Sequence, residues 1–201
     1  MREMILVVAL ITSSAPAWAG DFKGWYAGGG IAVGTSKDRV FPDYSGSYMD
    51  SPSALAFGGF NFTYGDFVFG PEVSLRANLT PQTVGRFDDG LGTYSTRATY
   101  EEAISPTFSL RAGISKDNLL LYGRAGVGAS HIRWASDEWR PYSHDRDTDH
   151  IDWRTLSGAI GAEYNFERIF VRVEAELRRL RYNSDVDMLE YQASTAIGVR
   201  F

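Results

Sequence analysis

The sequence of 201 residues contains no cysteine and only three histidines. Disulfide bonds, thiolate metal sites and cysteine nucleophiles are therefore excluded, and few geometries remain for a histidine-based active site. A basic surface for nucleic acid is also missing, because the formal net charge is -5 and the isoelectric point is about 5.2. No later segment is apolar over the length that a transmembrane helix needs. These absences disfavour nucleic-acid binding and much of ordinary enzyme chemistry.

The first residues have the pattern of an export signal. A short charged start at Met1–Met4 is followed by an apolar run over Ile5–Ile11 and then by Ala17-Trp18-Ala19. This order is typical of a secretory signal peptide with an A-x-A cleavage motif, and the apolar run is too short to cross a bilayer as a helix. The sequence predicts a signal peptide over residues 1–19 and one domain over 20–201. The alternative is a buried N-terminal helix.

Most of the remaining chain alternates between two kinds of residue. From Phe67 to Leu79 the odd positions are almost all apolar and the even positions are mostly small or charged, which is the period of a β-strand between two environments. The abundance of glycine (21 residues) and of aromatics (12 Phe, 11 Tyr and 5 Trp) also favours β-structure. We therefore expect eight strands, over 67–79, 104–115, 169–178 and 189–201 from a clear pattern and over 22–34, 53–64, 119–132 and 153–166 from a weaker one.

Short and long connections alternate between these predicted strands. Tight polar turns are expected near residues 65, 117 and 167, and polar loops over 35–52, 80–99, 134–152 and 183–187. The third loop is rich in aspartate and histidine, and Asp145, Asp147 and Asp149 offer oxygen ligands of the kind that Ca²⁺ takes. It lacks the glycine and the bidentate glutamate of an EF-hand, so a hydrated surface loop is the favoured interpretation.

The polar face indicates which side of the sheet is the interior. A soluble barrel would be apolar inside and a membrane barrel apolar outside, but here the polar positions match six glutamates with six arginines and no lysine. A solvated face needs no such matching, whereas a closed interior does, because each buried charge needs a hydrogen-bonded partner. The sequence therefore predicts an all-β, eight-stranded, antiparallel, up-and-down transmembrane β-barrel. Its interior salt-bridge network would comprise Glu72, Arg76, Glu101, Arg111, Arg124, Glu163, Arg172, Glu174, Glu176, Arg178, Glu190 and Arg200.

Two terminal segments resemble those of a known family. The segment Phe22–Gly30 looks like the first strand of small Gram-negative outer-membrane proteins, and Ala196–Phe201 looks like their assembly signal. With the Arg- and Glu-rich strand at Phe170–Tyr182, the chain resembles the eight-stranded barrels of the OmpA and opacity type. The resemblance implies an outer-membrane location with both termini in the periplasm, and contact with the lipid and the assembly machinery of that membrane. The residues of the implied assembly signal are Tyr191, Ile197, Val199 and Phe201.

The expected function is structural, with a closed charged interior and no cofactor. An opacity-type adhesin acting through the long loops is the alternative, and a low-conductance pore or a lipid A hydrolase is less favoured. A hydrolase would need serine and histidine on one face, but Ser130 and His131 are adjacent and so point to opposite faces of a strand. No catalytic or metal site is predicted.

Four arginines are expected outside the barrel, at its loop-side rim. Alternation places Arg133, Arg154, Arg179 and Arg181 outward on three neighbouring strands. Arginine binds phosphate bidentately, so these residues are candidate contacts to lipopolysaccharide. Ordinary snorkelling of arginine out of an apolar band is an equal alternative.

Overall fold

The computed structural model describes residues 22–38, 48–80, 82–88, 95–140, 143–181 and 187–201. The predicted signal peptide at residues 1–19 lies outside these ranges. No helix able to cross a membrane occurs in the part of the chain that is described. The described residues form nine antiparallel strands, which are β1 (Gly24–Asp38), β2 (Tyr48–Tyr64), β3 (Phe67–Asn78), β4 (Gln82–Asp88), β5 (Ser95–Lys116), β6 (Leu119–Arg140), β7 (Ser143–Phe166), β8 (Ile169–Arg181) and β9 (Asp187–Arg200).

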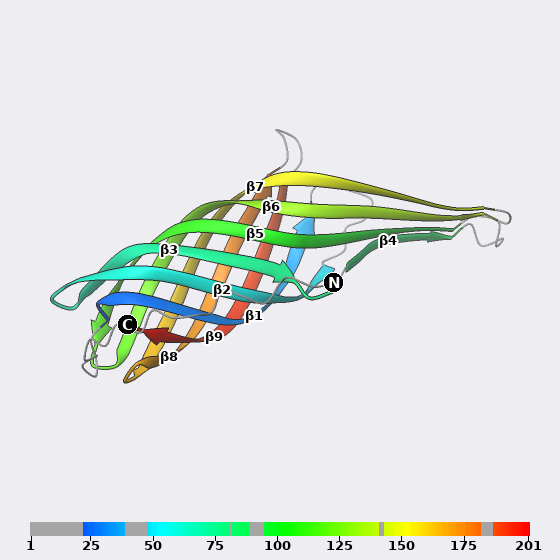
Figure 1. Cartoon of the computed structure of the whole chain (residues 1–201). Helices are drawn as coiled ribbons and strands as arrows, with labels where there is room; N and C mark the ends of the chain where they lie inside the picture. The colour runs from blue at the N-terminus through cyan, green and yellow to red at the C-terminus, as the bar shows by residue number, and fades with distance from the viewer. Residues whose placement is uncertain (1–21, 39–47, 81, 89–94, 141–142, 182–186) are drawn as a thin grey trace.

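Eight of these strands close into a barrel (Figure 1), as the sequence predicts. Consecutive strands pair with each other except β3 and β4, because β3 pairs with β5, and β1 pairs with β9 to close the barrel. The predicted tight turns near residues 65, 117 and 167 are confirmed, and Gly65, Asp117 and Glu167 have positive φ there. The last residue, Phe201, lies at the same end, where its backbone N–H donates to the Trp25 carbonyl at 2.9 Å.

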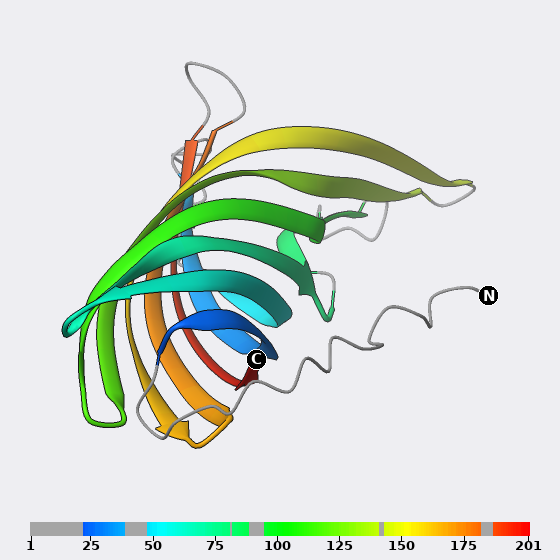
Figure 2. The ribbon, with the colours of Figure 1, turned by 60° about the vertical axis from the view of Figure 1, so that its left-hand side comes forward.

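The predicted loops over 80–99 and 134–152 are largely strands. β5, β6 and β7 continue far beyond the barrel, where Ser95 pairs with Trp139 and Trp139 pairs with His144, and β4 lies along β5. Figures 1 and 2 show β6 and β7 running past the ends of the other strands. We call this the extended sheet (82–88, 95–102, 133–140 and 143–152). Alternation did not reveal it, because most residues of these segments are polar and leave no hydrophobic period in the sequence.

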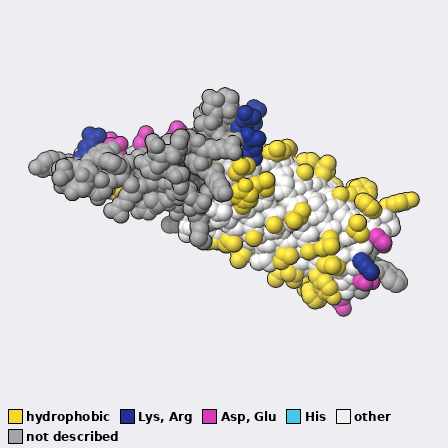
Figure 3. Space-filling view, turned by 180° about the vertical axis from the view of Figure 1, so that it is seen from behind, with side chains coloured by type: hydrophobic (Ala, Val, Ile, Leu, Met, Phe, Trp, Pro, Cys, Tyr) yellow, Lys and Arg dark blue, Asp and Glu magenta, His cyan; other side chains and the backbone are white. Residues whose placement is uncertain are grey.

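The barrel is apolar outside and polar inside. Among the side chains that the structure describes, burial confirms the inward and outward positions predicted for the strands after β1. In β1, whose faces were left open, Tyr26 and Ala32 point inward and Trp25 and Ile31 point outward. Large apolar side chains are exposed over the barrel wall, for example Ile160 at 71%. Figure 3 shows hydrophobic side chains spread over this wall and charged ones at its turn end. Such a surface matches a bilayer rather than water.

Candidate functional site

Glu163 of β7 lies at the centre of a buried ion network. Its carboxylate accepts two hydrogen bonds from Arg111, at 2.7 and 3.1 Å, and one from Arg172 at 2.9 Å. Arg200, from the last strand, also donates to it. Glu163 is fully buried, and each of the three arginines comes from a different strand. One carboxylate therefore ties together β5, β7, β8 and β9.

Glu72 of β3 forms the second centre of the network. Its Oε2 accepts from Arg172 Nη2 and from the Tyr26 hydroxyl, each at 2.8 Å, and lies 3.4 Å from Arg111 Nη1. Arg124 Nε is 3.7 Å from Oε1 of the same carboxylate. Because Arg111 and Arg172 contact both Glu72 and Glu163, the two acids are linked into a single charged layer.

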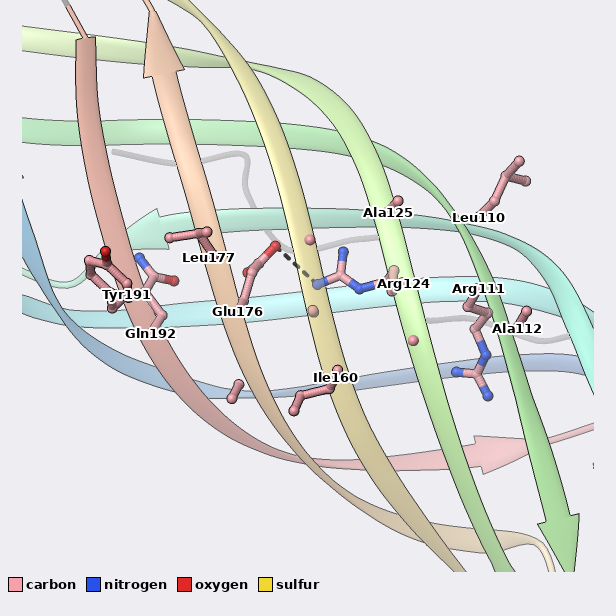
Figure 4. A pocket seen from close by; sticks show the side chains of 14 residues that line it. Leu110, Arg111, Ala112, Arg124, Ala125, Ile160, Glu176, Leu177, Tyr191 and Gln192 are labelled. Atoms are coloured by element: carbon pink, nitrogen blue, oxygen red, sulfur yellow. Dashed lines mark hydrogen bonds and ion pairs between the residues drawn. The ribbon is translucent and has the colours of Figure 1, made fainter.

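The network continues toward the extended sheet. Arg124 reaches Glu174 at 2.5 Å and Glu176 at 3.1 Å, and Arg76 reaches Glu176 at 2.5 Å. Figure 4 shows the Arg124–Glu176 contact across β7, with Arg111 directed to the same side and Leu110 to the other. Above this layer, Arg178 donates to Glu190 at 2.7 Å and to the hydroxyls of two serines.

Aromatic rings flank two guanidinium groups of the network. Arg111 lies between the rings of Tyr26 and Tyr122, with its Cζ 4.7 and 4.6 Å from their centroids. Arg172 lies 3.8 Å from the Phe57 centroid. These cation–π contacts were not anticipated from the sequence. The sequence did hold one signal for them, namely large aromatic residues at inward positions opposite glycines. A Cβ built at Gly28 would lie 2.5 Å from the Phe57 ring, and one at Gly161 would lie 2.5 Å from the Tyr122 hydroxyl.

A buried apolar cluster lies toward each end of the lumen. The turn-end cap consists of Phe22, Val68, Leu120 and Tyr122, and the Phe22 carbonyl accepts a hydrogen bond from Asn61 at 2.8 Å. The loop-end cap consists of Ile132, Leu180 and Met188, with Trp153 packed against it. The charged layers therefore lie between two apolar layers.

Eleven of the twelve residues of the predicted network have side chains that the structure describes, and these lie together in the lumen. All eleven are buried. Glu101 stands opposite Arg133 in the pairing of β5 with β6, beyond a register shift between Glu102 and Ile104, and its side chain is outside the described part. A register shift breaks the alternation of inward and outward positions that was counted from Ile104. The alternation therefore no longer supports the inward position predicted for Glu101.

The four rim arginines lie exposed on the outer side of β6, β7 and β8. Arg154 and Arg181 are directly paired, and Arg179 is paired with Leu156. Arg133 is paired with His150. Figure 3 shows a group of basic side chains where the apolar wall ends. The residues of the expected assembly signal, Tyr191, Ile197, Val199 and Phe201, are all exposed, on one face of the C-terminal segment.

Two further expectations concern the third loop and Ser130. Asp145, Asp147 and Asp149 follow one another on one face of β7, and no cluster of described His, Asp or Glu side chains could hold a metal ion. The hydroxyl of Ser130 is inside, 2.8 Å from those of Ser105 and Thr155, while His131 is exposed outside. Serine and histidine are therefore on opposite sides of the wall.

A closed antiparallel barrel with an apolar outer wall and an ionic lumen defines a transmembrane β-barrel protein. The family model of the outer membrane protein beta-barrel domain matches residues 5–201, and the chain belongs to this family.

Solved structures of small outer-membrane barrels share the fold. Neisserial surface protein A aligns with a TM-score of 0.53 and 15% identity, over 89% of this chain and 97% of that one. Ail, the attachment invasion locus protein of Yersinia pestis, aligns with a TM-score of 0.50 and 14% identity, over 88% and 99%. No curated protein matches the sequence. At these identities the likeness concerns the fold alone.

Proposed function

We propose that this protein is a non-conducting barrel with a structural role in the outer membrane of a Gram-negative bacterium. The observation that carries the proposal is the filled lumen, in which the ion network lies between the turn-end and loop-end caps. An eight-stranded barrel is just wide enough for its own side chains. Cross-strand ion pairs hold the wall together, and the exposed apolar residues anchor it in lipid. The outward C-terminal residues ending at Phe201 would be recognised by the assembly machinery.

Conductance measurements test this proposal. The folded barrel, reconstituted in a planar bilayer, should give no single-channel steps, because both caps exclude water. Replacing one large residue in each cap, Phe22→Ala with Leu180→Ala, should produce a measurable leak, whereas the outward change Leu156→Ala should not. Folding is checked on gels, where the unboiled barrel should migrate faster than the boiled form. Regular channel openings by the unaltered protein would contradict the proposal.

A second candidate function, binding to a host or cell surface, is favoured by the extended sheet. Its strands continue the barrel wall outward instead of forming irregular loops, so it provides a paired scaffold on which side chains are held in place. Exposed Trp139 stacks on His144 at 5.2 Å near the tip. Aromatic residues on a rigid scaffold are suitable anchors for a protein partner.

Shortening the β6–β7 hairpin tests the second function. Residues 136–147 are removed and Ala135 is joined to Thr148, its partner in the register, by an Asn-Gly turn. Bacteria that display this variant should lose adhesion to host cells, while the unboiled barrel should keep its fast migration. Unchanged adhesion would rule out the hairpin as the binding element. If the variant lost both adhesion and its fast migration, the cause would be a folding defect. The Trp139→Ala variant then decides, because loss of an anchoring ring should reduce adhesion without altering migration.

The arginine rim supports a third element of the proposal, contact with lipopolysaccharide. Arg133, Arg154, Arg179 and Arg181 are exposed just beyond the apolar outward pairs, such as Val127 with Leu156. At this level, guanidinium groups meet the phosphates of an outer leaflet, which they bind bidentately. Removing these charges should therefore weaken the binding of purified lipid A.

A further inference from the structure

All three histidines of the protein lie on one face of the β6–β7 hairpin. His131 pairs with Asp152, Arg133 with His150, and Trp139 with His144. Residues directly opposite in an antiparallel pair share a face, and so do residues two apart on one strand. This face is the continuation of the outer wall of the barrel, because His131 follows Val127 and Ala129 on β6. The histidines therefore share the face of the arginine rim.

Two of the histidines complete a compact group with the rim. On β6, Ala129, His131 and Arg133 stand opposite Arg154, Asp152 and His150 of β7, in that order. Paired Cα atoms are about 5 Å apart and same-face neighbours about 7 Å apart along a strand. The side chains of these positions can therefore reach one bound phosphate group. Arg181 of β8, paired with Arg154, extends the group on the far side.

The charges of this group change with pH. His131 Nδ1 lies 2.6 Å from Asp152 Oδ1, and the His150 backbone N–H donates to Asp149 Oδ1 at 2.8 Å. Arg133 lies opposite His150, and Arg154 lies two positions beyond Asp152 on the same face of β7. On the flanking strands, β5 places Ile104 opposite His131 and Glu101 opposite Arg133, while β9 places Asp187 opposite Arg181. Histidine changes its charge between pH 5 and pH 8. Each proton that an imidazole of this group takes up adds a positive charge among the arginines and beside Asp152.

We infer that His131, Arg133, His150, Asp152 and Arg154 form a binding site for the phosphate of a lipid headgroup, and that this site binds more tightly as the pH falls. The inference rests on the proposed contact with lipopolysaccharide and adds two histidines and a regulation to it. At neutral pH the arginines alone attract the phosphate, and Asp152 opposes them. In acid, protonated His131 neutralises Asp152 and protonated His150 becomes a further donor.

The test uses the detergent-solubilised barrel and lipid A with two phosphates. Binding should be roughly tenfold tighter at about pH 5.5 than at about pH 7.5. The lipid cannot supply this increase, because a phosphate monoester loses charge as the pH falls. The double variant His131→Gln, His150→Gln should bind no more tightly at the lower pH than at the higher one, with its affinity at neutral pH close to that of the parent. His144→Gln is the matched control: it lies on the same face, six residues or about 20 Å from His150 along β7, and it should keep the full pH dependence.

The outcomes separate the inference from the proposal beneath it. If the double-histidine variant keeps the tenfold increase, the inference is wrong while the lipopolysaccharide contact stands. If Arg133→Gln with Arg154→Gln binds lipid A as the parent does at both pH values, the contact itself is wrong. Lipid A without phosphates should bind weakly and independently of pH. Equal binding of inorganic phosphate alone, with the same pH dependence, would overturn the assignment to a lipid headgroup.

Discussion

The Glu163→Gln variant should lose about 3–5 kcal/mol of folding free energy, the range measured when one partner of a buried ion pair is removed. A neutral amide would then lie where Arg111, Arg172 and Arg200 now meet a fully buried carboxylate. Three guanidinium groups would share the remaining acids, and their positive charges would repel one another without compensation. The midpoint of urea unfolding, followed by the loss of fast migration on unboiled gels, measures this change.

Glu138→Gln provides the matched control for this prediction. Glu138 makes a similar contact, 3.2 Å to Arg140, but on the extended sheet, where the side chains are 36% and 62% exposed. Exposed pairs contribute about 1 kcal/mol or less, so the urea midpoint should hardly move. If Glu163→Gln unfolded at the same urea concentration as Glu138→Gln, the ion network would not be what holds the barrel together.

The Gly30→Val variant should prevent proper closure between the first and last strands, at a cost of about 3 kcal/mol or more. Gly30 faces inward on β1, and a Cβ there would lie 2.1 Å from the Thr195 carbonyl oxygen and 2.6 Å from the Ala196 Cβ of β9. The nearest obstacle is backbone and cannot rotate away. The two strands would have to separate at the pairing that closes the barrel. The fraction of protein that migrates as the folded form on unboiled gels reports this loss.

The neighbouring glycine tests whether the effect depends on direction. Gly29 faces outward, and its nearest obstacle, the Leu55 carbonyl oxygen, is 3.3 Å from a built Cβ. Gly29→Val should therefore fold nearly as well as the parent, because its side chain would enter lipid. Equal yields of folded barrel for the two variants would show that the close approach of β1 to β9 does not limit closure.

The charged interior could be predicted because the interior of a barrel this narrow leaves no alternative to exact pairing of charge. Alternation places Glu72 and Val73 on opposite faces, and likewise Arg172 and Val173, and the neighbouring residues of these strands alternate between polar and apolar in the same way. The partners of each charge could not be predicted, because Arg111 reaches Glu163 across 52 residues through the tilt and stagger of the strands. The direction of β1 was also open, since Gly28, Gly29 and Gly30 carry no side chain to indicate a face.

The extended sheet shows where sequence patterns fail. Most of its residues are polar, so the hydrophobic period that identifies a strand is absent from the sequence. The pairing of β6 with β7 places Trp139 opposite His144. The loops predicted over 80–99 and 134–152 were therefore wrong for the residues of these ranges that the structure describes. The register shift at Glu102 and Ile104 likewise left no trace in the composition of β5. The placement of His131 and His150 beside Arg133 and Arg154 depends on that pairing and not on their spacing in the chain.

By itself, the sequence determined the class of fold, the strand faces with clear alternation, the tight turns and the set of charges that would fill the lumen, because each depends on a residue's own polarity and its neighbours two positions away. Only the tertiary structure decided which arginine meets which glutamate, that an apolar cap lies toward each end of the lumen, and that two rim arginines stand among histidines. These features join residues on different strands, and the closure and register of the whole barrel bring them together.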